Sequence, residues 1–349
     1  KNFTKFSDLT MNFSPKVNII LGENGTGKSH LMKAAYAIYA GFGSIKEGPE
    51  TSEEDFNKAM TNTLLKIFMP LENKIGKLRR HGSGGSENAQ ITAEFSSGKK
   101  LGLNFHTNSK AVALKGKNEF NEELPGSVFI PTKEVLSFME GFTSLYSKFA
   151  VSFDQTYYDI CVLLDFPLAR EEQLTEKSKW AIREIENTIE GKFVFHGGGR
   201  VTFKSADGEF SANAMAEGFR KIGMLSRLLE TTSIQPGKSG PLFWDEPEAN
   251  INPKLMHLLV EILLELARNG QQIILATHDY VLLKCFDLFP NKAREDHVRF
   301  HSLFCDPDSG ETRLQSTDDY RAITPNAIAD TFNDLTQEQV RLKMGNLGK

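Results

Sequence analysis

The spacing of apolar and polar positions predicts an α/β chain. Residues 17–21 form a mostly apolar run that is typical of a buried strand, and residues 29–42 carry apolar side chains at helical spacing. Residues 2–21 as a whole are expected to hold two or three short strands. After residue 240 the alternation returns, with strands predicted at 241–245, 271–276, 297–305 and 311–316 and helices at 253–268 and 279–287. Strands that alternate with helices favour the α/β class.

The middle of the chain has a different pattern and predicts inserted segments. Helical periodicity covers 51–80 and most of 133–190, whereas period-2 alternation over 90–115 predicts a small antiparallel sheet. Further elements are a buried strand at 127–131, three short strands between 192 and 212, and helices at 213–231 and 325–345. Polar loops are expected at 44–50 and 81–89.

Composition and charge narrow the function classes. The 349 residues are 40% hydrophobic, which suffices for one large domain with insertions. The formal net charge of −4 excludes a uniformly basic nucleic-acid wrapper. A local basic cluster at Lys77, Arg79, Arg80 and His81 fits a solvated helix end better than a nucleic-acid contact.

Cysteine usage and hydropathy predict a cytoplasmic protein. The three cysteines have no close spacing, which argues against a zinc site or a disulfide framework and suits a reducing compartment. We find neither an apolar run of membrane-spanning length nor a signal-peptide pattern. No membrane contact is therefore expected.

The strand at 17–21 runs directly into a phosphate-binding pattern. The segment fits G-x-x-x-x-G-K-[ST] and consists of Gly22, Glu23, Asn24, Gly25, Thr26, Gly27, Lys28 and Ser29. Glycines let the backbone N–H groups turn toward phosphate oxygens, and a side chain in the loop would block them. Lys28 would reach the β- and γ-phosphates, and Ser29 would bind Mg²⁺. The expected ligands are ATP and Mg²⁺.

Two later predicted strands end in acidic and imidazole side chains. The strand at 241–245 ends in Asp245 and Glu246, and ligands of open α/β sheets sit at the carboxyl ends of strands. Asp245 suits a Mg²⁺ ligand. Glu246 suits a general base that polarises the attacking water. The next strand ends at His278, which we interpret as a switch that contacts the γ-phosphate.

A small-residue segment opens the helix at 213–231. Ala216, Glu217 and Gly218 precede Arg220, and exposed backbone N–H groups at a helix start can bind an anion. The simpler interpretation is a helix with a glycine in its first turn.

Taken in chain order, these segments resemble the head of ABC-type ATPases: P-loop, signature helix, Walker B acidic pair, D-loop and switch histidine. The sequence DEPEANINP, residues 245–253, resembles the Walker B pair and the D-loop after it in the non-transporter branch that includes Rad50, SMC, RecF and OLD-like proteins. Within that branch the chain is similar to soluble AAA-family ATPases of bacterial anti-phage and abortive-infection systems, such as the PtuA subunit of Septu. The resemblance covers residues 1–30 and 211–283.

The sequence differs from the family pattern at one position of the signature. The family signature carries a serine before its glycine, whereas this chain has Ala216, so the hydroxyl contact to the γ-phosphate is absent. Backbone N–H groups and Arg220 are then left to contact the nucleotide. No Q-loop glutamine is identifiable, and residues 131–134 are where it would lie.

The resemblance implies a domain plan and partners. It implies one ABC-type head over 1–349, with a nucleotide-binding core at 1–50 and 240–316, an inserted helix and β patch at 51–125, and a helical lobe at 133–235. No long coiled-coil arm is expected. ATP would join two heads head-to-tail as a homodimer or higher homo-oligomer.

Two functions fit this implied head. In the first, the ATPase senses phage and controls a separate toxic effector, such as a nuclease, because the chain carries no nuclease signature of its own. The alternative is a RecF-like DNA repair ATPase, which leaves direct binding of nucleic acid open. A transporter subunit fits poorly, since DEPEANINP lacks the transporter-type D-loop.

Overall fold

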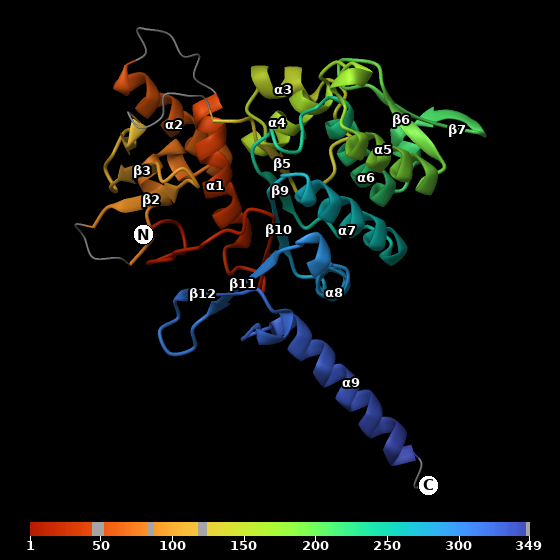
Figure 1. The fold of residues 1–349 in the computed structure, drawn as a ribbon. Coiled ribbons are helices and arrows are strands. Elements are labelled where there is room, and N and C mark those ends of the chain that lie inside the picture. Colours follow the sequence, from red (N-terminus) through yellow and green to blue (C-terminus); the bar gives the residue numbers. More distant parts are fainter. Residues whose placement is uncertain (44–51, 83–86, 118–123, 347–349) are drawn as a thin grey trace.

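The computed structural model describes residues 1–43, 52–82, 87–117 and 124–346. Within this part, a central sheet has six strands in the order β12-β11-β1-β10-β9-β5 (Figure 1). They are β1 (Val17–Leu21), β5 (Val128–Ile130), β9 (Leu242–Asp245), β10 (Ile273–Thr277), β11 (Val298–Cys305) and β12 (Thr312–Thr317). All pairs are parallel except β11 with β12. The α/β class and these strand positions are confirmed.

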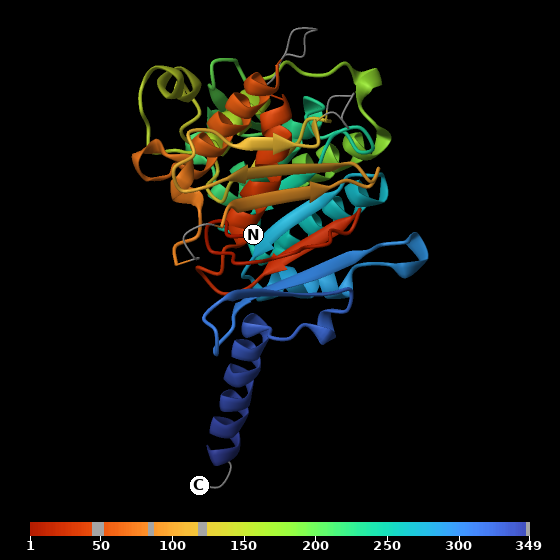
Figure 2. The same cartoon turned by 90° about the vertical axis from the view of Figure 1, so that its left-hand side faces the viewer.

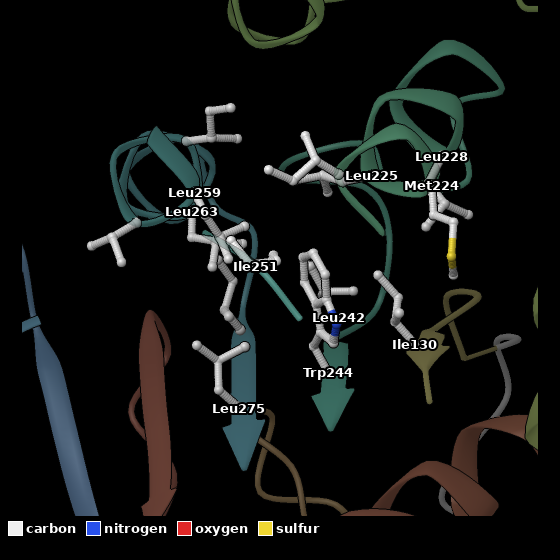
Figure 3. Packing of buried hydrophobic residues seen from close by; sticks show 14 of the residues in the cluster. Ile130, Met224, Leu225, Leu228, Leu242, Trp244, Ile251, Leu259, Leu263 and Leu275 are labelled. Carbon is white, nitrogen blue, oxygen red and sulfur yellow. The ribbon is translucent and has the colours of Figure 1, made fainter. Parts of the chain in front are cut away.

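Helices cover both faces of this sheet. On one face, α1 (Lys28–Gly43) packs over Ile20, Phe129 and Phe243, and α2 (Glu53–Phe68) lies behind it. The other face is covered by α6 (Glu217–Glu230), α7 (Pro253–Arg268) and α8 (Tyr280–Leu288). Figure 3 shows Trp244 and Leu275 of the sheet pointing at α6 and α7. Burial on both faces explains why β1, β9 and β10 are largely apolar.

The first insertion is a helix followed by a small antiparallel sheet. Strands β2 (Ala89–Glu94), β3 (Lys100–Phe105) and β4 (Ala113–Lys115) pair in sequence order beside α1 and α2 (Figure 2). The helix predicted at 51–80 is too long, because α2 ends at Phe68. Met69 has a left-handed backbone with φ 44°, and Pro70 cannot continue the helix. The predicted loop at 44–50 and part of that at 81–89 lie outside the described residues.

The prediction of several strands before residue 15 is wrong. Among residues 2–14, the structure has only isolated bridges of Phe3 with Phe6 and with Arg79. Both phenylalanines are buried. Their apolar spacing therefore comes from a tight loop that packs against the core, not from a strand. Strand β1 begins at Val17.

The second insertion combines helices with another antiparallel sheet. It contains α3 (Phe142–Lys148), α4 (Gln155–Leu164), α5 (Glu176–Thr188), and β6 (Gly191–Phe195), β7 (Val201–Ser205) and β8 (Gly208–Ser211). These strands lead into α6, which packs against α5 and β6. The insertion therefore connects through α6 to the face of the sheet that lies opposite α1.

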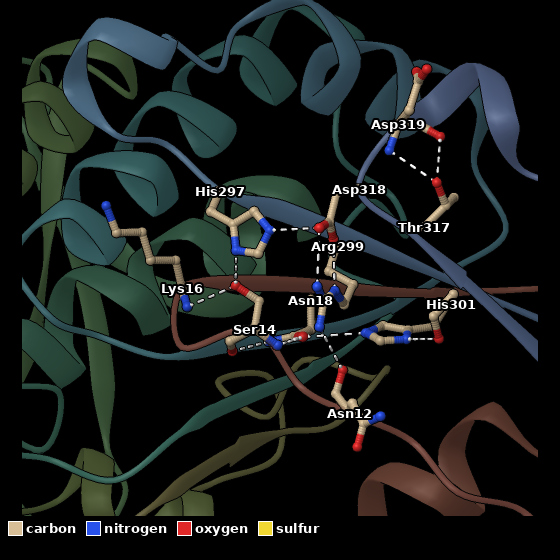
Figure 4. Close-up of polar contacts among 11 residues, drawn as sticks. Asn12, Ser14, Lys16, Asn18, His297, Arg299, His301, Thr317, Asp318 and Asp319 are labelled. Atoms are coloured by element: carbon tan, nitrogen blue, oxygen red, sulfur yellow. Dashed lines mark hydrogen bonds and ion pairs between the residues drawn. The ribbon is translucent and has the colours of Figure 1, made fainter. Parts of the chain in front are cut away.

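A polar cluster lies between β1, β11 and the segment that follows β12 (Figure 4). Ser14 Oγ lies 2.8 Å from His297 Nδ1, and His297 Nε2 lies 3.2 Å from Asp318 Oδ2. Asn18 Oδ1 accepts the Ser14 N–H at 2.6 Å and lies 3.2 Å from His301 Nε2. This resembles a Ser–His–Asp triad in order, but Ser14 is 0% exposed and its hydroxyl cannot reach a substrate. The cluster joins the start of β1 to the later strands.

The last element is α9 (Ala327–Asn346), which projects away from the rest of the molecule (Figures 1 and 2). A helix at this position is confirmed. Across the described residues, none of the helices is both long enough and apolar enough to cross a membrane.

Candidate nucleotide-binding site

The P-loop connects the end of β1 to the start of α1, as its sequence predicts. Gly22 and Gly27 have φ values of +147° and +102°, which side-chain-bearing residues rarely adopt. A Cβ on Gly22 would lie 2.2 Å from the Leu303 carbonyl oxygen, and one on Gly27 would lie 2.7 Å from Cζ of Phe6. These glycines are therefore required by the loop's own neighbours as well as by the space a phosphate needs.

Lys28 is held across this loop. Its Nζ donates to the carbonyl oxygens of Gly22 at 2.7 Å and Glu23 at 3.1 Å, and the residue is 7% exposed. Burial lowers the pKa of Lys28, and the negative charges of Glu246 and Asp245 act in the opposite direction. Among the described residues, the acceptors of this desolvated ammonium group are thus neutral carbonyls, and a phosphate oxygen would be a stronger acceptor.

Ser29 and Asp245 meet although most of the chain separates them. Asp245 ends β9, is 7% exposed, and accepts hydrogen bonds from the side chains of Ser29 and Thr132. Burial raises the pKa of Asp245, and the Ser29 hydrogen bond lowers it in part. A hydroxyl and a carboxylate are oxygen ligands of the kind that Mg²⁺ prefers. The donor set at this position therefore fits the predicted Mg²⁺.

Glu246 and His278 also come together. Glu246 has a left-handed backbone with φ 50°, and its N–H donates to the Ala276 carbonyl at 2.9 Å. Its Oε1 lies 3.2 Å from Nδ1 of His278, which follows β10. Both side chains remain partly exposed, whereas Asp245 is buried. A carboxylate that is accessible and paired with an imidazole can accept a proton from water.

Glu248 is a site residue that the sequence analysis missed. It is 6% exposed, and its Oε1 accepts the Thr277 hydroxyl at 2.7 Å and the His278 backbone N–H at 3.2 Å. Burial raises the pKa of Glu248. Within the described residues, its Oε2 is buried without a hydrogen-bond partner. The sequence feature that could have indicated Glu248 is its place two positions after Glu246, in a segment with apolar residues on both sides.

Lys221 is a second missed residue and joins α6 to the site. It is 0% exposed, and its Nζ donates to the carbonyl oxygens of Glu246 at 2.7 Å and Ala249 at 3.3 Å. Burial lowers the pKa of Lys221 to about 8. At the start of the same helix, a Cβ on Gly218 would lie 2.6 Å from the Asn250 carbonyl oxygen. The signature helix therefore contacts the D-loop closely within one chain.

The predicted signature residues make their contacts outside the P-loop of the same chain. Arg220 Nε forms an ion pair with the buried Glu134 Oε1 at 2.9 Å, and its Nη1 donates to the Met215 carbonyl. Across the described residues, no hydrogen bond or ion pair joins Glu217, Gly218 or Arg220 to residues 22–29. Glu134 lies in the segment 131–134, where a Q-loop residue is expected. The ion pair therefore links that segment to α6.

Family models cover both halves of this site. A model described as "AAA domain" matches residues 1–195. The chain belongs to the AAA domain family. A second model, described as "AAA domain, putative AbiEii toxin, Type IV TA system", matches residues 202–284 of this AAA domain chain. The first match contains the P-loop, and the second contains α6, Asp245, Glu246 and His278. The P-loop ATPase part of the resemblance is thus confirmed.

Curated relatives of this AAA domain protein match over short stretches. RecF, the DNA replication and repair protein, of Bacillus cytotoxicus is 47% identical over 38 residues, which cover 11% of this chain and 10% of that protein. RecF of Bacillus mycoides is 31% identical over 104 residues, covering 30% of this chain and 24% of that protein. The chain thus spans a quarter or less of the length of these relatives.

Solved structures show the fold of the AAA domain chain. An SMC head bound to the C-winged helix domain of ScpA superposes with a TM-score of 0.55 at 13% identity, covering 91% of this chain and 95% of that one. An SMC head with an extended coiled coil, bound to a ScpA domain derived from Pyrococcus furiosus, gives 0.51 at 13% identity, covering 97% and 98%. The predicted ABC-type head fold is confirmed.

Proposed function

We propose that this chain binds ATP with Mg²⁺ and hydrolyses it. The observation that carries the proposal is the convergence of Lys28, Ser29, Asp245, Glu246 and His278, from three neighbouring parallel strands, on one edge of the sheet. Edges of this kind hold ligands in open α/β sheets. Membership of the AAA domain family supports the same reaction.

Each residue has a role that its surroundings support. Lys28 exchanges its loop carbonyls for phosphate oxygens. Ser29 and Asp245 would hold Mg²⁺, which would offset the negative charge of the phosphates. Glu246 accepts the proton of the attacking water, and His278, held beside it, contacts the γ-phosphate.

We further propose that two copies complete each site. Within one chain, Gly218 and Arg220 contact the D-loop and Glu134 rather than the P-loop. A head-to-tail arrangement would place the signature helix of a second copy, with residues 217–220, over the ATP of the first. Contacts that exist only with the γ-phosphate would favour the closed pair with ATP and release it after hydrolysis.

The biological output that we propose is control of a separate toxic effector, such as a nuclease, in anti-phage defence of the PtuA type. The match of residues 202–284 to a family described with a putative toxin of a toxin–antitoxin system supports this proposal. The alternative is a DNA repair role, which the short RecF matches favour. Stimulation of ATP hydrolysis by gapped duplex DNA would favour repair, and nucleotide-dependent co-purification with a toxin would favour defence.

Isothermal titration calorimetry tests the first step. We expect one ATP per chain with Mg²⁺ and none for Lys28→Met, while the matched surface variant Lys58→Met binds as the unmodified chain does. Equal binding by Lys28→Met, or no Mg²⁺-dependent binding of ATP by the unmodified chain, would reject the proposal.

A further inference from the structure

Helix α9 is anchored to the body only at its start. Ile328 packs against the core, and the Phe332 ring stacks on Tyr280 of α8, with centroids 4.2 Å apart and planes at 17°. From Asp330 to Lys343 every side chain is exposed. Figures 1 and 2 both show the helix extending away from the rest of the molecule. Single helices of this length are marginal in water unless an apolar face is covered.

The exposed part of α9 continues an apolar stripe that begins on the body. Ile328, Phe332, Leu335, Gln339 and Leu342 follow one another at alternating spacings of four and three residues, which is the a/d pattern of a coiled coil. Leu335 is 62% exposed and Leu342 is 59% exposed. The stripe therefore presents a seam that the described part of this chain covers only in part, at Ile328 and Phe332.

The charged residues beside the seam indicate which partner would cover its exposed positions. With Phe332 and Gln339 at a, Glu338 occupies a g position and Lys343 the following e position. In a parallel, in-register pair, g of one helix faces the following e of the other, so Glu338 would face Lys343 of the second copy in both directions. In an antiparallel pair, Glu338 would face its own counterpart, and like charges repel.

We propose that α9 pairs in parallel with α9 of a second copy of this chain, through Leu335, Gln339 and Leu342. The polar Gln339 at a core position fixes the register at a cost in stability. With so short a seam, the pairing is expected to be reversible and to depend on chain concentration. It needs no nucleotide and is therefore separate from the proposed ATP-dependent closure.

Cysteine cross-linking tests the seam directly. Cys305 is the exposed cysteine among the three, so Cys305→Ser gives a background in which Cys161 and Cys285 are buried. In that background, without nucleotide, Gln339→Cys at the seam should oxidise to a covalent dimer. Val340→Cys, 50% exposed but one position off the seam, should yield several-fold less. Equal yields at the two positions would overturn the proposal.

A charge exchange tests the partner and the orientation. In sedimentation experiments without nucleotide, Glu338→Lys and Lys343→Glu should each shift the chain toward the monomer, and the double variant should return it toward the dimer. Glu338 also pairs with Arg341 on its own helix at 2.8 Å, so the recovery is expected to be incomplete. A chain that stays monomeric at every concentration, or a double variant no better than the singles, would overturn self-pairing and leave α9 to another protein.

Discussion

Glu248 joins the ends of two neighbouring strands, because its Oε1 accepts the Thr277 hydroxyl at 2.7 Å and the next backbone N–H, that of His278, at 3.2 Å. We predict that Glu248→Leu, which keeps the volume but removes both acceptors, lowers ATP turnover about 10- to 100-fold, since hydrogen bonds to charged groups contribute about 1.5–3 kcal/mol. Affinity for ATP should not change, because Lys28 and Ser29 remain. Turnover and calorimetry on the same preparation measure both.

Two further variants sharpen this experiment. Glu248→Gln retains one acceptor oxygen and should lose less activity than Glu248→Leu. Glu261→Leu, on the exposed side of α7, should leave turnover unchanged. Full activity in Glu248→Leu would mean that the turn before His278 needs no support from Glu248.

Glu246→Gln is predicted to bind ATP and fail to hydrolyse it. The amide keeps the shape of the side chain but cannot accept a proton, and loss of a general base costs about 10²- to 10⁴-fold in rate. ATP should then hold two heads together, and size-exclusion chromatography should show an assembly that grows only when Mg²⁺ and ATP are both present. An elution volume indifferent to ATP would contradict the head-to-tail mechanism, whatever α9 does.

Gly218→Ala is predicted to destabilise the junction between the signature helix and the D-loop. The new Cβ would lie 2.6 Å from the Asn250 carbonyl oxygen and 3.2 Å from Cα of Ile251, so backbone must move. Overpacking of this kind costs about 1–3 kcal/mol. The matched control Gly43→Ala adds a Cβ in open space at the end of α1 and should not lower the thermal midpoint. Equal midpoints for the two variants would contradict the prediction.

His301 is predicted to make stability fall in mild acid. Its ring is 0% exposed, between Ser316 Oγ at 2.8 Å and Asn18 Oδ1 at 3.2 Å, and burial lowers the pKa of His301 from 6.5 to about 4. As the pH falls, His301 becomes protonated near pH 6.5 in the unfolded chain but only near pH 4 in the folded chain. Stability is therefore full above pH 6.5 and declines below it, by up to about 3 kcal/mol at pH 4.

Thermal unfolding between pH 7.5 and 4.5 measures this decline. His301→Gln keeps a polar side chain but cannot titrate, so its midpoint should fall less steeply than that of the unmodified chain. The neighbouring Asp318 acts in a lower window, because a hydrogen bond from Arg299 holds the pKa of Asp318 at about 2. Parallel curves for the two proteins would exclude His301 as the cause.

The sequence was enough to place the strands that carry the site, because each is a short, largely apolar run. Lys28, Ser29 and Asp245 could be brought together because carboxyl ends of parallel strands share one edge. The structure of the first residues could not be predicted in the same way. Phe3 and Phe6 are buried in a loop, and apolar spacing alone does not distinguish such a loop from a strand.

The contacts that support the site could not be predicted. Lys221 and Glu248 are charged residues, and charged side chains are rarely fully buried, so a sequence pattern assigns them to the surface. Their burial depends on carbonyl oxygens and hydroxyl groups brought in by distant turns. The ion pair of Arg220 with Glu134 likewise joins α6 to the segment after β5, which lies far from α6 along the chain.

Strand β1, which leads into the P-loop, has β10 and β11 as its two neighbours, and both are made from the last third of the chain. During synthesis, the P-loop therefore emerges from the ribosome before the two strands that flank β1. A nascent or prematurely terminated polypeptide lacking residues 273–305 would have no neighbours for β1, and its loop would lack the Leu303 carbonyl against which Gly22 is packed. The nucleotide binding that we propose would thus be gained late in translation, and incomplete copies would lack it.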